Sequence, residues 1–155
     1  MIDENDIETD NGAAEYVTLT ADGARFGVPL LRVNDVFRPL GLTRVPLAPL
    51  SVAGILSLRG RIVTVIDIDA RLGRPSRAGA KMAVTVDLNG ESYALMVDRV
   101  TDVVALPQAA IQSAPANLDP QLAKFASGIF WHEDTLLVIL DVDRLLDLEE
   151  EAVAA

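Results

Sequence analysis

The hydrophobic pattern is clearest in the first half of the chain, where two apolar runs flank a short polar corner. The runs occupy residues 55–58 and 62–66, and the second is dominated by β-branched residues. Between them stands Arg59-Gly60, which places a glycine in the turn of a tight hairpin. The pattern therefore predicts a β-hairpin, followed by a brief helix that Asp67 caps.

This pattern is repeated later in the chain. Residues 62–69 align with residues 136–143 at an offset of 74 without a gap, while Glu133-Asp134 replaces the Arg-Gly corner. A second alignment, at an offset of 67, relates residues 17–36 to residues 84–103. The chain is therefore predicted to be an internal duplication whose second copy gained seven residues between its two matched segments.

Short strands separated by turn signals fill most of the remaining sequence. The further predicted segments are strands at 16–20, 25–28, 34–38, 82–88 and 91–97, a helical turn at 30–33, an extended stretch at 44–49, a linker at 73–80 and a helix at 141–148. Two copies of this kind, with few helical patterns, predict a mainly β fold of two small barrels. We expect the lobes at about residues 16–74 and 82–148, with strands that can be exchanged between them.

Composition excludes several kinds of site. The chain of 155 residues is 50% hydrophobic, which is enough for an ordinary core, and it contains no cysteine. Disulfides, thiolate chemistry and cysteine-zinc sites are therefore excluded, and His132, the one histidine, leaves no clustered-histidine metal site. We expect no cofactor. No apolar run approaches the roughly 20 residues that cross a bilayer, so we expect a cytoplasmic protein.

The net charge of −10 is concentrated at the two ends of the chain. Nine acidic residues lie in segments 1–15 and 149–155, which we expect to be solvated tails, the first of them disordered. Residues 16–148 carry 14 acidic and 13 basic residues. Because these charges are mixed along the sequence without a basic stripe, the pattern argues against nucleic acid as a partner.

The stretch from Val52 to Ile68, with Leu58-Arg59-Gly60 before a valine-rich strand that ends in Asp67, resembles the signature of the CheW-like family. The resemblance covers about residues 15–148; Ser57 and Thr64 depart from the usual asparagine and proline. It implies two SH3-like five-stranded barrels and a scaffold without enzymatic activity. Such adaptors of two-component chemotaxis signalling bridge the cytoplasmic tips of methyl-accepting chemoreceptors to the regulatory domain of a CheA-type histidine kinase, and can contact other CheW-like domains in an array.

The hairpin corner is the first candidate site. The resemblance places Arg59 on the interaction motif of the family, and Asp35 on a position where the family carries an acidic residue linked to partner binding. A guanidinium can hold a carboxylate through two parallel hydrogen bonds, whereas an ordinary exposed arginine contributes little. We expect Arg59 and Asp35 to lie close together at the lobe junction, with Gly60 supplying the positive φ of the turn.

Four duplicated valines form the second candidate site, because the resemblance implies a receptor groove between the barrels. They are Val33, Val36, Val100 and Val103. A groove that binds a helix needs such an apolar strip, although a valine in a strand is more often a core residue.

Three other interpretations compete with a chemotaxis adaptor. The first is a CheW-like adaptor of a kinase system that does not control motility. The second is a small hydrolase that uses Asp35, Asp67 or Asp102, but the sequence pairs no nucleophile with a base. The third is an SH3-like binder of proline-rich peptides, for which the seven scattered aromatic residues provide no lined groove. Helix capping explains the Asp-x-Asp pairs better than metal binding does.

Overall fold

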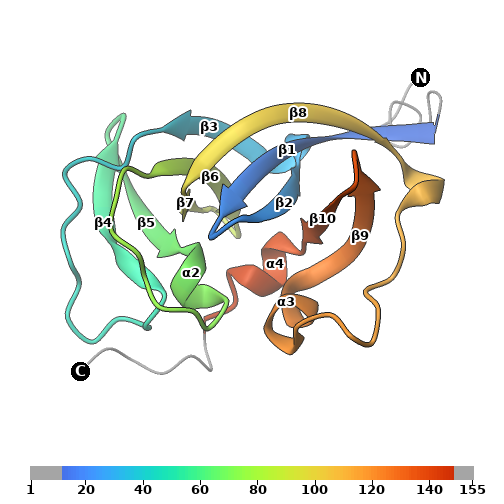
Figure 1. Ribbon diagram of the computed structural model, residues 1–155. Coiled ribbons are helices and arrows are strands. Elements are labelled where there is room, and N and C mark those ends of the chain that lie inside the picture. The colour runs from blue at the N-terminus through green and yellow to red at the C-terminus, as the bar shows by residue number, and fades with distance from the viewer. Residues whose placement is uncertain (1–11, 149–155) are drawn as a thin grey trace, which may run out of the picture.

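The computed structural model describes residues 12–148, which form two five-stranded sheets lying side by side (Figure 1). The terminal sheet has the order β8-β1-β2-β10-β9, and the middle sheet has the order β3-β6-β7-β5-β4. Strands of the terminal sheet are β1 (Ala13–Ala21), β2 (Ala24–Pro29), β8 (Arg99–Pro107), β9 (Ala126–His132) and β10 (Thr135–Leu140). Strands of the middle sheet are β3 (Val33–Phe37), β4 (Val52–Leu58), β5 (Arg61–Asp67), β6 (Met82–Leu88) and β7 (Glu91–Val97). The predicted mainly β fold is confirmed.

Strand pairing confirms the internal duplication. If each of β1–β5 is exchanged with its counterpart in β6–β10, the order of the terminal sheet becomes that of the middle sheet. The register is also repeated. Val17 of β1 pairs with Val28 of β2, and the residues 67 positions later, Val84 of β6 and Leu95 of β7, pair in the same way. The two sheets are thus two copies of one topology.

Each sheet takes strands from both copies. The chain leaves β2, passes through a 3-10 turn at Leu30–Arg32, enters the middle sheet at β3 and returns to the terminal sheet at β8. Residues 30–97 therefore form a middle half, and residues 12–29 together with 98–148 form a terminal half. Residues 13–15, which the sequence analysis placed in the acidic tail, belong to β1.

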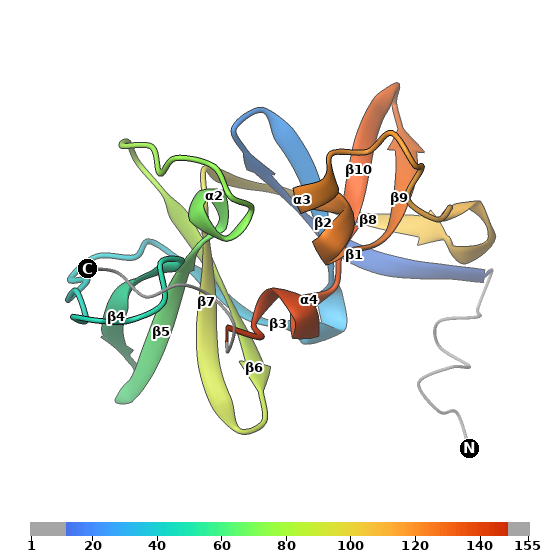
Figure 2. The same ribbon diagram turned by 90° about the horizontal axis from the view of Figure 1, so that it is seen from below.

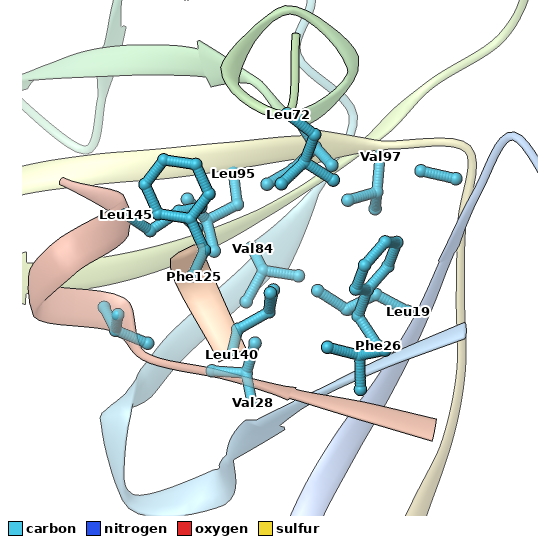
Figure 3. Close-up of a cluster of buried hydrophobic side chains, with 14 of the residues drawn as sticks. Leu19, Phe26, Val28, Leu72, Val84, Leu95, Val97, Phe125, Leu140 and Leu145 are labelled. Carbon is cyan, nitrogen blue, oxygen red and sulfur yellow. The ribbon is translucent and has the colours of Figure 1, made fainter. Parts of the chain in front are cut away.

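The largest hydrophobic core lies between the two sheets. Figure 3 shows Leu19, Phe26 and Val28 of the terminal sheet facing Val84, Leu95 and Val97 of the middle sheet, all of them buried. Each sheet also has a small cluster of its own, around Leu56 and Val65 in the middle sheet and around Leu106 and Leu137 in the terminal sheet. Because most buried side chains are shared, the two sheets form one folding unit.

The outer strands of each sheet are joined only by an isolated bridge within the described chain. Thr43, after β3, pairs with Ile55 of β4, and Gln112, after β8, pairs with Ile129 of β9. The equivalent glycines Gly54 and Gly128 permit these close approaches, since a Cβ at position 54 would stand 2.4 Å from the Thr43 carbonyl oxygen. The sheets therefore curl as SH3-like barrels do, without a continuous closing ladder.

Short helices gather along the junction of the sheets (Figure 2). They are α2 (Ile68–Arg71), α3 (Pro120–Phe125) and α4 (Val142–Leu145). Asp67 caps α2 as predicted, and Asp141 caps α4, which is shorter than the helix predicted at 141–148. The sequence analysis missed α3, although Asp119-Pro120 is an N-cap followed by an N1 proline. No helix within residues 12–148 has the length and apolar character needed to cross a membrane.

Candidate protein-interaction site

The tip of the β4–β5 hairpin has two residues in the left-handed region. The φ angle of Arg59 is 53° and that of Gly60 is 79°, and Leu58 pairs with Arg61 on either side of them. This geometry matches a type I′ turn, which suits the twist of a hairpin but favours Asn, Asp or Gly at its first position. An arginine there is conformationally unfavourable, so the tip retains Arg59 at a cost in stability.

An ion pair orients the Arg59 side chain. Its Nη1 lies 2.7 Å from Asp35 Oδ2 on β3, and the two side chains are 77% and 21% exposed. Asp35 Oδ1 accepts a hydrogen bond from the Val36 N–H at 2.9 Å, which holds the carboxylate. Both residues belong to the middle sheet, so the pair lies within one half of the molecule instead of at the expected lobe junction. The guanidinium is thus oriented on one edge and open to solvent on the others.

A shallow cavity of about 120 Å³ adjoins this ion pair. Seven of its nine lining residues are polar or charged: Asn34, Asp35, Leu58, Arg59, Arg61, Val63, Thr85, Asp87 and Ser92. Arg61 is exposed and makes no ion pair with the rest of residues 12–148. Two neighbouring guanidinium groups beside small polar side chains can receive a carboxylate from a partner.

The equivalent tip of the β9–β10 hairpin has the opposite charge. Glu133 and Asp134 adopt φ angles of 50° and 63°, so the turn is repeated without its glycine. Trp131 is 60% exposed beside this tip. The asymmetry between the two tips seen in the sequence is therefore an asymmetry between two exposed surfaces.

The charges of the two halves are also opposite. Residues 30–97 contain nine Lys and Arg against five Asp and Glu, a formal charge of +4. The terminal half contains four Lys and Arg against ten Asp and Glu, a formal charge of −6. This separation escaped the sequence analysis, because the charges are mixed along the chain and separate only when the strands are exchanged.

The four valines differ in exposure. Val33 and Val100 are half-buried against the central core, whereas Val36 and Val103 are 41% and 51% exposed. The exposed pair lies on β3 and β8, which are outer strands of the two sheets. Val36 and Val103 therefore offer the larger exposed surfaces, and all four valines stay a prediction as partner contacts.

Comparison with known proteins agrees with this fold and site. The family model described as "CheW-like domain" matches residues 15–150. The chain belongs to the CheW-like family. It is 25% identical over 146 residues to "Chemotaxis protein CheW" of Rhizobium meliloti (93% of this chain, 94% of the relative), and 25% identical over 141 residues to its namesake in Helicobacter pylori (90% and 85%).

A solved structure has the same fold as this CheW-like chain. It is described as "Crystal structure of scaffolding protein TtCheW from Thermoanaerobacter tengcongensis", with a TM-score of 0.79 and 24% identity, and the match covers 91% of this chain and 94% of that one. Together with the family match, the named relatives make this CheW-like chain a non-enzymatic scaffold of the chemotaxis type. The expectation of an adaptor without enzymatic activity is confirmed.

Two further features of the CheW-like chain were not found from the sequence. Arg71 is buried in α2, and its Nε and Nη2 donate hydrogen bonds to the carbonyls of Leu145 (2.7 Å) and Asp147 (2.6 Å) at the end of α4. Its guanidinium carbon also lies 4.5 Å from the centre of the Phe125 ring. This arginine joins the helices of the two copies. Its equivalent in the second copy is Leu145, so comparison of the two copies does not reveal the role of Arg71.

A cluster of ion pairs holds the linker between the copies. Arg77 and Lys81 donate hydrogen bonds to Asp98 at 2.6 and 2.7 Å, and Arg77 also lies 3.2 Å from Asp69. Burial alone would raise the pKa of Asp98, but the hydrogen bonds from Lys81, Arg77 and the Asp22 N–H outweigh it and hold this pKa well below its usual range. Asp69 and Asp98 therefore have a structural role, because both form ion pairs with residues of the linker. No group of three or more metal-ligating side chains occurs in the part of the chain described.

Proposed function

We propose that this chain couples the cytoplasmic tips of chemoreceptors to the regulatory domain of a CheA-type histidine kinase. Membership of the CheW-like family supports a scaffold, and a coupling scaffold needs two separate faces. The Arg59 tip and the exposed valines of β3 and β8 are the two faces that we assign. Each is exposed, and they differ in chemistry, one being cationic and the other apolar.

The Arg59 tip is assigned to the kinase domain. The observation that carries this assignment is an arginine kept in an unfavourable turn conformation, 77% exposed, and oriented by Asp35 at 2.7 Å. A guanidinium held on one edge can present its remaining N–H groups to a partner carboxylate with little further loss of entropy. Gly60 acts indirectly, because it completes the turn that presents Arg59.

Val36 and Val103 are assigned to the receptor. Each is a large apolar side chain left exposed on an outer strand, at 41% and 51%. Val33 and Val100 on the same strands are partly buried against the central core. Apolar side chains on a rigid surface are the anchors that a receptor helix needs.

The opposite charges of the two halves favour contacts with other CheW-like domains. A half of formal charge +4 on one molecule attracts a half of formal charge −6 on the next, which produces a head-to-tail contact. Such a heterologous contact forms rings or extended chains instead of closed dimers. This geometry suits an array in which each weak contact is reinforced by its neighbours.

Charge reversal at the tip tests the kinase assignment. We expect Arg59→Glu to weaken binding of the kinase regulatory domain by about tenfold or more, because it places a carboxylate beside Asp35 and repels the partner. Arg99→Glu is the control, since Arg99 is exposed on β8 and the net charge changes equally. If Arg59→Glu remains folded by circular dichroism and binds the kinase domain as tightly as Arg99→Glu, the assignment is wrong.

Substitution of the exposed valines tests the receptor assignment. We expect Val36→Arg and Val103→Arg to reduce receptor-tip binding in titration calorimetry by about tenfold each, because a charge would enter an apolar contact. Ile62→Arg provides the control, since Ile62 is 64% exposed on β5, away from both valines along the chain. Equal binding by all three variants and the parent chain would remove the valines from the site.

A further inference from the structure

A groove of about 570 Å³ lies between the loop that follows β3 and the linker that leads into β6. The loop contributes Arg38, Pro39 and Leu40, and the strands contribute two methionines, Met82 at the start of β6 and Met96 near the end of β7. Its volume is within the range of pockets that hold a ligand or a partner side chain. Neither of the two faces assigned above includes this groove.

The groove and the Arg59 tip lie at opposite ends of the middle sheet. Figure 2 shows the β4–β5 and β6–β7 turns at one end of this sheet and the linker at the other. Met96 pairs with Asp67 of β5, and Arg61 precedes Asp67 by six residues along that strand, a distance of roughly 20 Å. A partner in the groove therefore leaves the tip free.

Ion pairs hold the linker wall of the groove in place. Lys81 and Arg77 line this wall, and their side chains lie 2.7 and 2.6 Å from the two carboxylate oxygens of Asp98. Arg77 also lies 3.2 Å from Asp69, whose side chain is 4% exposed. The wall is thus formed before a partner arrives, which lowers the entropy lost on binding. The same pairs neutralise both of these cations.

The loop wall of the groove offers two groups that no other described residue engages. Leu40 is 78% exposed, which is the largest exposure among the large apolar side chains described. Arg38 is exposed, and its guanidinium makes no ion pair within residues 12–148. Met82 and Met96 are half-buried, and unbranched thioether side chains adapt to apolar groups of different shape. The groove therefore combines an adaptable apolar lining with one unneutralised cation.

We propose that this groove docks a partner segment that presents a large apolar side chain next to a carboxylate. The apolar side chain contacts Leu40, Met82 and Met96, and the carboxylate pairs with Arg38. The formal charge of +4 on residues 30–97 favours an acidic segment over a basic one. The groove is then a third face of the scaffold, and the inference does not depend on which partners the Arg59 tip and the valines bind.

Methionine methyl signals in an NMR titration test the docking directly. The chain has three methionines, of which Met82 and Met96 line the groove and Met1 serves as the reference. The probe is the peptide acetyl-Glu-Leu-Phe-Glu-amide, and acetyl-Lys-Leu-Phe-Lys-amide is its charge-reversed control. We expect the acidic peptide to shift the signals of Met82 and Met96 saturably, and the basic peptide to bind at least about fivefold more weakly. No saturable shift, or equal affinity for the two peptides, overturns the proposal.

Substitutions in the loop wall separate specific docking from general charge attraction. We expect Arg38→Glu to weaken binding of the acidic peptide at least about fivefold. Arg61→Glu is the matched control, because Arg61 is exposed in the same half, the net charge changes equally, and we expect no loss of peptide affinity. Equal losses in the two variants mean attraction to the whole half and overturn the site. Leu40→Ser should also weaken binding, and an unchanged affinity in this variant overturns the apolar contact.

The same methyl signals distinguish two other occupants. Octanoate carries an apolar chain and a carboxylate without a peptide backbone, and tighter binding of octanoate than of the acidic peptide assigns the groove to a small molecule. Shifts of Met82 and Met96 that grow with protein concentration, without any peptide, assign it to a second copy of the chain. Either result overturns a docked partner segment, whereas peptide binding that is weakened by Arg38→Glu and not by Arg61→Glu supports it.

Discussion

The two equivalent glycines offer a matched test of how the outer strands are joined. Gly54 and Gly128 occupy the same place in the two copies, yet an added methyl group would meet different atoms. At position 54 it would stand 2.4 Å from the carbonyl oxygen of Thr43, and at position 128 it would stand 2.7 Å from the Cγ2 of Ile111 and 3.0 Å from the carbonyl oxygen of Gln112. The Ile111 side chain can rotate away and the Gln112 carbonyl oxygen is less crowded, whereas the Thr43 carbonyl oxygen must move further and its bridge would break.

The expected cost follows from these contacts. In Gly54→Ala the Thr43 carbonyl must move by about 1 Å, and the two 2.8 Å hydrogen bonds between Thr43 and Ile55 are lost. Overpacking strain of about 1–3 kcal/mol and roughly 1 kcal/mol for each of the two hydrogen bonds give a loss of about 3–5 kcal/mol. In Gly128→Ala the Ile111 side chain yields, and we expect about 1–2 kcal/mol.

Urea unfolding followed by circular dichroism measures this difference. Gly90→Ala is the control for simple loss of a glycine, because a Cβ there meets nothing within 4 Å and the change costs only the left-handed conformation, about 1 kcal/mol. The expected order of destabilisation is position 54, then 128, then 90, with equal m-values. If Gly54→Ala is no more destabilising than Gly90→Ala, the bridge does not constrain this approach and our account of it is wrong.

Three further predictions test the junction, the linker and the turn. Arg71→Met should lower the free energy of unfolding, measured in urea, by about 3–5 kcal/mol, because buried carbonyls at the end of α4 lose their charged donor. The control Arg144→Met, at an exposed arginine, should cost under about 1 kcal/mol. Equal losses in the two variants would contradict this prediction. The depressed pKa of Asp98 stabilises the fold above the ordinary carboxyl pKa near 4, so stability is lost as the pH falls below about 4 and toward the folded pKa. Asp98→Asn should flatten this decline in unfolding measured from pH 6 to 2.5, and an unchanged slope would argue against the cluster. Gly60→Ala should cost about 1 kcal/mol in the same assay, as should Gly90→Ala, because both positions have open space and φ near 80°; a cost near zero would exclude a strained turn.

Local features of the fold were predictable from the sequence because they depend on neighbouring residues. Hairpins at Arg59-Gly60 and Asn89-Gly90, the Asp67 cap and the duplication itself all follow from turn chemistry and hydrophobic spacing. The helix at Pro120–Phe125 was missed, since six residues are too few for a helical period to show.

The candidate site was predictable only in part. The contrast between Arg59 and Glu133 identified the tip, and the resemblance identified Asp35. Whether the two would meet within one half or between halves depended on the exchange of strands. The repeat also gave no sign that Val36 and Val103 are exposed whereas Val33 and Val100 are partly buried against the central core, because burial depends on which residues the other elements cover.

By itself, the sequence determined the elements of this protein: ten strands in two matching sets, tight turns, and one corner whose charge differs between the sets. The tertiary structure alone decided which strands share a sheet, and through that the central core, the opposite charges of the two halves and the buried position of Arg71. The physical reason is that turns and strands are set by interactions between near neighbours, whereas burial and charge separation arise from contacts between residues 70 or more positions apart, such as Arg71 and Leu145.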